Sequence, residues 1–253
     1  MLDFAGKKIL VTGASRGIGR AVATAFAAMG GKVAINFRNN KKSASETLNV
    51  LDGGGHVLVQ ADVSVPDGAR SAVEESVSKL NGLDIVVNNA GIYEVHPLDS
   101  VGFDEWCSFW QKTINVNLMG PANICYFAAR HMMESGGGRI VNISSRGAFR
   151  GEPDAPAYGA SKAGVNALSQ SLAVALAPHN IFVGVVAPGF VETDMVTDML
   201  AGPAGDAIRA QSPVGRVARP DEVANAVLFL ASAGAEFTTG TIIDVNGASY
   251  LRS

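Results

Sequence analysis

The stretch TGASRGIG, residues 12–19, follows the first apolar run of the chain and opens a segment with helical spacing at 17–29. Glycines at such a junction let the backbone approach a ligand closely, and the free N–H groups at the start of a helix favour a phosphate. The spacing Gly13-x3-Gly17-x-Gly19 is not the GxGxxG dinucleotide pattern. The position of the turn therefore predicts a phosphate-bearing ligand, and a tight turn without a ligand is the alternative.

Apolar runs rich in Val and Ile alternate with segments of helical spacing along the chain. The runs lie at 7–13, 31–37, 56–63, 83–91, 138–145, 181–189 and 241–247. The helical segments between them lie at 17–29, 41–52, 66–80, 109–134, 157–177 and 220–232. This alternation predicts an α/β fold of the Rossmann type, a doubly wound sheet of about seven parallel strands with helices on both faces. No linker-like stretch divides residues 1–253, so we expect a single domain.

Composition excludes several classes of function. The net charge of −3 argues against nucleic acid as a partner, because a basic face is expected there. No apolar run has the length of a membrane span, and the N-terminus has no apolar core of a signal peptide, so we expect a cytoplasmic chain. Cys107 and Cys125 favour a reduced protein over a disulfide framework. No metal site is predicted, because no metal-like spacing joins the cysteines or the four histidines, His56, His96, His131 and His179.

The residues after the second apolar run bear on the choice of nucleotide. In dinucleotide folds an acidic residue near this point binds the ribose 2′-hydroxyl, whereas an arginine accommodates a 2′-phosphate. This chain has Asn36 and Arg38 there, with Lys41 and Lys42 behind them. Together with Arg16 in the glycine turn, Arg38 favours NADP(H) over NAD(H). The alternative is that these basic residues are a solvated helix start.

Four polar residues form a candidate catalytic set. Tyr158 and Lys162 lie at i and i+4 and share one face of the predicted helix. A nearby ammonium favours the phenolate, as would the positive charge of an oxidised nicotinamide, so we expect a lowered pKa for Tyr158. Ser145 follows a strand and could hold a substrate oxygen, and the amide of Asn117 could bind water that links Lys162 to solvent.

These motifs together resemble the short-chain dehydrogenase/reductase family. They comprise TGASRGIG, Asp62-Val63, NNAG at 88–91, Asn117, Ser145, Tyr158-x3-Lys162, and Pro188-Gly189 with Thr193. The resemblance implies that Asp62 and Val63 contact the adenine, that Asn89 and Gly91 shape the cofactor floor, and that Val191 and Thr193 meet the nicotinamide end. It implies Asn117, Ser145, Tyr158 and Lys162 as the catalytic tetrad. The full set of expected cofactor contacts is Gly13, Ser15, Arg16, Gly17, Ile18, Gly19, Arg38, Asp62, Val63, Asn89, Gly91, Tyr158, Lys162, Pro188, Gly189, Val191 and Thr193.

The resemblance implies hydride transfer between a nicotinamide and a small-molecule carbonyl or secondary alcohol, with Tyr158 as the general acid/base. TGASRGIG, INFRNN and APGFVETDM are closest to 3-oxoacyl-carrier-protein reductases, so reduction of a 3-oxoacyl thioester of a carrier protein or of CoA is the alternative. The segments MMESGGGR and SLAVALAPH lack the basic residues that would steer an acidic carrier protein. A sensor that binds NADP without turnover is a third possibility.

Other segments suggest how a substrate is admitted. Segment 92–116 is longer than in that group, and it either remodels the substrate mouth or lengthens the helix entry. Segment 190–212 resembles a substrate lid. The charged residues between Ser145 and Tyr158, which are Arg146, Arg150, Glu152 and Asp154, are expected in a solvated loop, and contact with a polar substrate is the alternative.

We also expect assembly into a homotetramer, with a dimer as the alternative. The two long helical segments carry more small and apolar residues than one sheet face needs, among them Ala122, Ala128, Ala129, Ala167, Leu168, Leu172 and Leu176.

Overall fold

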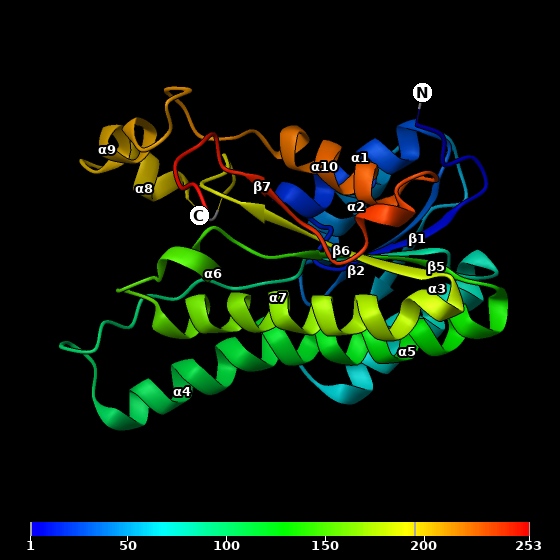
Figure 1. Ribbon diagram of the computed structural model, residues 1–253, viewed down its shortest axis with the longest axis horizontal. Helices are drawn as coiled ribbons and strands as arrows, with labels where there is room; N and C mark the ends of the chain where they lie inside the picture. The colour runs from blue at the N-terminus through cyan, green and yellow to red at the C-terminus, as the bar shows by residue number, and fades with distance from the viewer. Residues whose placement is uncertain (1, 195, 253) are drawn as a thin grey trace.

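Seven parallel strands form one sheet in the order β3-β2-β1-β4-β5-β6-β7 in a computed structural model that describes residues 2–194 and 196–252 (Figure 1). The strands are β1 (Lys8–Val11), β2 (Lys32–Phe37), β3 (Val57–Gln60), β4 (Ile85–Asn88), β5 (Gly138–Ile143), β6 (Ile181–Pro188) and β7 (Ile242–Val245). Each coincides with one of the predicted apolar runs, because strands buried on both faces need continuous apolar sequence. The Rossmann-type prediction is confirmed.

Helices cover both faces of this sheet. In Figure 1, α1 (Gly17–Ala28), α2 (Lys41–Asn49) and α10 (Pro220–Ala231) lie on one side, and α5 (Gly120–Ser135) and α7 (Pro156–Leu176) lie on the other. Phe26 and Val227 belong to the core of the first layer. Ile124 and Leu176 belong to the core of the second layer, to which α3 (Pro66–Leu80) also contributes.

The long helix predicted at 109–134 is interrupted. The structure has α4 (Phe103–Ile114), a π-helical turn (Asn115–Met119) and then α5. The N–H of Gly120 bonds to the Asn115 carbonyl, five residues back, and Pro121 has no N–H to continue the ordinary pattern. Such turns within α-helices occur frequently at functional sites. The apolar pattern at 109–134 predicts one continuous helix and does not reveal this turn.

The remaining helices are short. They are α6 (Gly147–Arg150), α8 (Thr197–Ala201), α9 (Gly205–Ala210) and the 3₁₀ turns Ala177–His179 and Glu236–Thr238. Among the described residues, no helix has the length and apolar character needed to cross a bilayer. No three His, Cys, Asp or Glu side chains in the same residues gather as metal ligands would.

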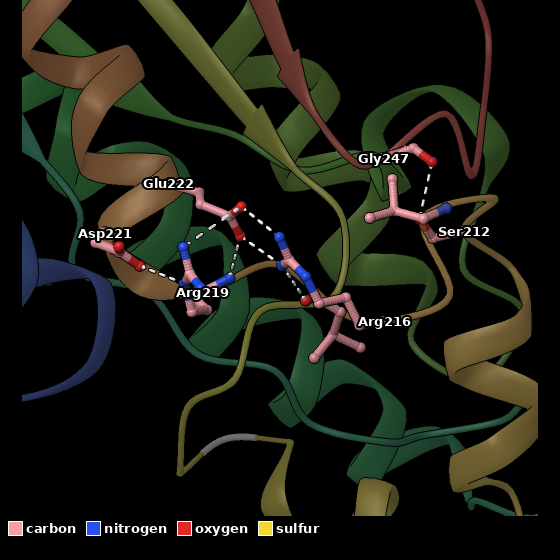
Figure 2. A network of polar contacts seen from close by, with 8 residues as sticks. Ser212, Arg216, Arg219, Asp221, Glu222 and Gly247 are labelled. Atoms are coloured by element: carbon pink, nitrogen blue, oxygen red, sulfur yellow. Dashed lines mark hydrogen bonds and ion pairs between the residues drawn. The ribbon is translucent and has the colours of Figure 1, made fainter.

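A polar network fixes the chain between α9 and α10 (Figure 2). Both terminal nitrogens of the Arg216 guanidinium donate to the Glu222 carboxylate, at 2.6 and 2.7 Å. The same carboxylate accepts the N–H of Arg219 at 2.7 Å, which caps α10. These hydrogen bonds lower the pKa of Glu222 to about 2. Nearby, the Ser212 hydroxyl donates to the carbonyl of Gly247 at 2.8 Å. Residues 212–222 are thereby tied to the C-terminal strand region and to α10.

Candidate active site

The turn after β1 requires glycine at two positions. Gly13 and Gly17 have φ of +62° and +55°, a region that L side chains rarely adopt. A Cβ atom on Gly13 would also lie 2.9 Å from the Cα of Ala90. The backbone after β1 therefore packs directly on the backbone after β4, and α1 starts at this contact with its free N–H groups directed outward from the sheet edge.

Asn89 and Thr12 hold this turn in place. The Asn89 amide donates to the carbonyls of Thr12 and Gly13, at 2.9 and 3.1 Å. The Thr12 hydroxyl accepts the N–H groups of Asn89 and Ala90, both at 3.0 Å. A Cβ on Gly19 would lie 2.5 Å from the Asn89 amide nitrogen, so Gly19 is what lets that amide reach the turn.

A cavity of about 360 Å³ opens along the carboxyl ends of the strands. Open parallel sheets bind ligands at this edge, where the strand order reverses between β1 and β4. The cavity wall contains the expected residues Gly13, Ser15, Arg16, Gly17, Ile18, Arg38, Asp62, Val63, Asn89, Gly91, Ser145, Tyr158, Lys162, Pro188, Gly189, Val191 and Thr193. Two expected site residues, Gly19 and Asn117, are buried behind this wall instead.

Asn36, Arg38 and Asp62 form the end of the cavity beyond β2. Asn36 is buried; its amide donates to the carbonyls of Val59 and Ala61 and accepts the N–H of Gly13 at 3.4 Å. Asn36 thus links the end of β2 to the ends of β1 and β3. As an amide, it also places no negative charge at this end of the cavity. The guanidinium of Arg38 is half exposed and lies 3.8 Å from the Asp62 carboxylate. An exposed pair at that distance is weak, so Arg38 is available to an anion.

Tyr158, Lys162 and Ser145 meet at the other end of the cavity. Tyr158 and Lys162 are both on α7, with the Lys162 ammonium nitrogen 5.7 Å from the centre of the Tyr158 ring. That ammonium donates to the Ile143 carbonyl at 2.8 Å, which anchors it to the end of β5. Ser145 hydrogen-bonds the Tyr158 side chain, and its hydroxyl also accepts the N–H of Gly147 at 3.0 Å.

The expected direction of the Tyr158 pKa is wrong for this structure. Burial raises the pKa of the Tyr158 phenol to about 12, and the hydrogen bond from Ser145 only partly opposes it. Burial also lowers the pKa of Lys162 to about 8. Desolvation is the largest cause of both pKa shifts, and the i, i+4 spacing does not reveal how far the two side chains are buried.

Asn117 acts on the cavity wall from behind. It is fully buried in the π-helical turn, where its amide oxygen accepts the Ile92 N–H at 2.9 Å and its amide nitrogen donates to the Ile92 carbonyl at 3.0 Å. The nitrogen also donates to the Ser161 hydroxyl at 3.2 Å. Asn117 therefore joins the segment after β4 to α7.

Segment 92–116 contributes to the cavity wall at its start and to a helix farther on. Tyr93 lines the cavity, and its ring lies edge-on to Tyr158 with ring centres 5.0 Å apart. Farther on, His96 is buried against Phe109 and accepts the N–H of Ala157 at 3.3 Å, at the start of α7. The rest of the segment contains α4, which leads into the π-helical turn.

The solvated-loop prediction for residues 146–154 is wrong for two of its four charges. Arg150 and Asp154 are exposed, whereas Arg146 is 4% exposed and Glu152 is half-buried. Arg146 stacks on Phe190 at 5.2 Å and donates to the Ser249 hydroxyl at 2.7 Å. Both Arg146 and Glu152 line the cavity.

Segment 190–212 forms one side of the cavity and contains α8 and α9. Phe190, Val196 and Met199 supply apolar surface to the wall. Its first part is tied to the chain before α10 by backbone hydrogen bonds between Phe190, Glu192 and Ala218. Met195, within the lid predicted at 190–212, lies outside the described residues, and motion of this segment stays a prediction.

Comparison with known proteins identifies the family. The family model described as enoyl-(acyl carrier protein) reductase matches residues 13–248. The chain belongs to the short-chain dehydrogenase/reductase family. It is therefore an oxidoreductase of the family that acts on carbonyl and alcohol groups.

Members of the family resemble this chain along its whole length. A 3-oxoacyl-[acyl-carrier-protein] reductase of Staphylococcus aureus is 38% identical over 97% of this chain and 98% of its own. The 3beta-hydroxysteroid dehydrogenase 1 of Eggerthella lenta is 37% identical over 98% and 95%. A short-chain dehydrogenase from Burkholderia cenocepacia, solved in complex with NADP, superposes with a TM-score of 0.87 at 36% identity over 97% and 98% of the two chains.

Replacing Gly19 with alanine tests the packing behind the glycine turn. The new methyl group would displace the Asn89 amide and break its hydrogen bonds to the turn. We expect a loss of about 1–3 kcal/mol in the free energy of unfolding, measured by urea denaturation. Gly54→Ala is the control, because no atom lies within 4 Å of a Cβ there. Equal stability of the two variants would contradict this account of Gly19.

Proposed function

We propose that this protein is an NADP(H)-dependent reductase of small-molecule carbonyl compounds that also oxidises the corresponding secondary alcohols. The observation that carries the proposal is the convergence of Tyr158, Lys162 and Ser145 in a cavity whose other end is bounded by the glycine turn and Arg38. A phosphate-binding turn and an acid/base tyrosine in one cavity match the two ends of a bound nicotinamide nucleotide.

The cavity fits such a nucleotide. Gly13 and Gly17 give the turn a backbone conformation that L side chains rarely adopt, and α1 begins there with its N–H groups free for a pyrophosphate. Arg38 would hold a 2′-phosphate in the place where an NAD-dependent protein has a carboxylate. Asp62 and Val63 would contact the adenine, and Pro188, Gly189, Val191 and Thr193 would surround the nicotinamide.

Tyr158 is the proton donor in the reductive direction. Its high pKa keeps the phenol protonated at neutral pH, so it can donate a proton to a carbonyl oxygen that Ser145 holds. When bound, the nicotinamide supplies the hydride. The positive charge of Lys162 would stabilise the phenolate left after proton transfer, and Asn117 would help to return a proton from solvent.

A 3-oxoacyl-thioester reductase is the second candidate, supported by the Staphylococcus aureus relative. Against the carrier-protein form, the end of α5 and the following turn, residues 132–139, offer one arginine, and its side chain pairs with Glu236. Little steering of an acidic carrier is expected from this surface. A CoA thioester does not depend on such steering.

We also propose assembly into a homotetramer. Part of the sequence argument is corrected here, because Ala128, Ala129 and Leu176 are buried within the single chain. Other apolar side chains remain exposed on the helical layer of α4, α5 and α7, namely Phe103, Tyr126 and Val174 at 79%, 62% and 79%. Self-association would cover them.

Removal of the phenolic hydroxyl tests the assigned proton donor. Tyr158→Phe should lower kcat for NADPH-dependent reduction by about 10²–10⁴-fold, because no other group replaces the donor. NADPH binding, followed by its fluorescence, should change little. Tyr93→Phe is the matched control and should retain proton transfer. Undiminished turnover in Tyr158→Phe would refute the mechanism.

The phosphate role of Arg38 predicts a change in nucleotide preference. Arg38→Ala should weaken NADPH binding by about tenfold or more while leaving NADH binding nearly unchanged, since only NADPH carries the 2′-phosphate. Lys42→Ala, at the exposed start of α2, is the control. A similar loss of affinity for both nucleotides, or for neither, would show that Arg38 does not bind the 2′-phosphate.

The lowered pKa of Lys162 predicts an alkaline limb in the activity profile. The ammonium is charged below its pKa of about 8 and neutral above it, so kcat/KM for NADPH, which reports the free protein, should fall as pH rises through about 8. Lys162→Arg keeps its charge, and its residual activity should lack this limb. A level wild-type profile to about pH 10 would contradict the role of the lysine charge.

A further inference from the structure

A carboxylate lies in the cavity wall close to the reacting groups. Glu152 follows α6 and lines the same cavity as Tyr158 and Ser145. A Cβ on Gly147 would lie 2.5 Å from its Oε1 atom, so the carboxylate rests directly on the Gly147 backbone. The N–H of that glycine donates to the Ser145 hydroxyl. Gly147 therefore contacts both the Glu152 carboxylate and Ser145, the residue assigned to hold the substrate oxygen.

The Glu152 carboxylate has no close partner among the residues that the structure describes. No side chain or N–H in residues 2–194 and 196–252 hydrogen-bonds it or forms an ion pair within 4.0 Å. Its pKa is raised, chiefly by burial, while the more distant charges of Arg150 and Arg146 oppose that rise. The carboxylate is half-buried and lines the open cavity, so a donor on a ligand can take the place of solvent at its oxygens.

The surrounding charges decide which donor fits. Arg146 and Arg150 lie near enough to act on Glu152, and Asp154 acts in the opposite direction, so the four charges nearly balance. Because these charges nearly balance, an ammonium group would gain little net attraction while losing its hydration, which disfavours it. A neutral hydroxyl meets no such opposition. An aliphatic acyl chain would cover the carboxylate and leave it without a hydrogen bond.

We infer that Glu152 is a specificity-determining residue that accepts a hydrogen bond from a substrate hydroxyl and selects hydroxylated carbonyl compounds over unsubstituted ketones and acyl thioesters. This inference rests on the proposed reductase function, because it assigns the substrate class of that same site. Tyr93 is a neighbouring polar residue that supports the inference. It lines the same cavity, its ring packs edge-on against the Tyr158 ring, and burial, together with the negative charge of Glu152, raises the pKa of its phenol.

Matched substrate pairs test the inference. Acetoin is compared with butanone, and dihydroxyacetone with acetone, using NADPH and the wild type, Glu152→Gln, Glu152→Ala and the control Asp154→Asn. The wild type should prefer the hydroxylated member in kcat/KM. In Glu152→Ala that preference, measured as the ratio of the two kcat/KM values, should fall by about tenfold or more. Glu152→Gln, which keeps an acceptor without the charge, should fall between, and Asp154→Asn should match the wild type.

A binding measurement separates this inference from the proposed function. Butanediol and butanol are titrated calorimetrically into the NADP-treated wild type and Glu152→Ala, without any need for turnover. Tighter binding of the diol that disappears in Glu152→Ala supports the inference even if no ketone is reduced, an outcome that would overturn the proposed function alone. Equal effects on both members of each pair, or a preference for aminoacetone over acetoin, would overturn the assignment of a hydroxyl to Glu152.

Discussion

The direct packing of the turn after β1 on the backbone after β4 is the constraint on which the site depends. Only a hydrogen atom fits between Gly13 and Ala90, and the Asn89 amide closes the contact through the space left at Gly19. Because β1 and β4 are adjacent where the strand order reverses, this contact also sets the floor of the crevice. The Ser15 carbonyl, which accepts hydrogen bonds from Arg20, Ser43 and Thr47, fastens the turn to α2 on its other side.

The reactive end of the cavity depends on a buried chain of polar groups. The amide of Asn88 on β4 donates to Asn142 on β5, and Asn142 donates to the Ser169 hydroxyl on α7, both at 2.8 Å. Farther along α7, the Ser144 hydroxyl donates to the Lys162 carbonyl at 3.2 Å. Buried hydrogen bonds of this kind fix the position of a helix more narrowly than apolar contacts do. They place the helix that carries Tyr158 at a defined height above the strand ends.

The strands and the larger site were predictable for a physical reason. Buried parallel strands need continuous apolar runs, and side chains that follow such runs must gather at one edge of the sheet. That logic places Arg38, Asp62 and Ser145 in one cavity. It does not extend to features set by close packing. The π-helical turn at Asn117, the burial of Arg146 and the raised pKa of Tyr158 depend on how neighbouring elements cover these groups, which no local pattern records.

The central claim is that the cavity brings a nicotinamide and a carbonyl carbon together for hydride transfer. Its most direct test is reduction of a carbonyl panel with NADPH in which both hydrogens at the nicotinamide C4 position are deuterium, followed by mass spectrometry of the alcohol. The account predicts NADPH oxidation with deuterium on the carbinol carbon of the product. Oxidation that leaves the product unlabelled, or bound NADPH that no carbonyl compound in the panel oxidises, would contradict it.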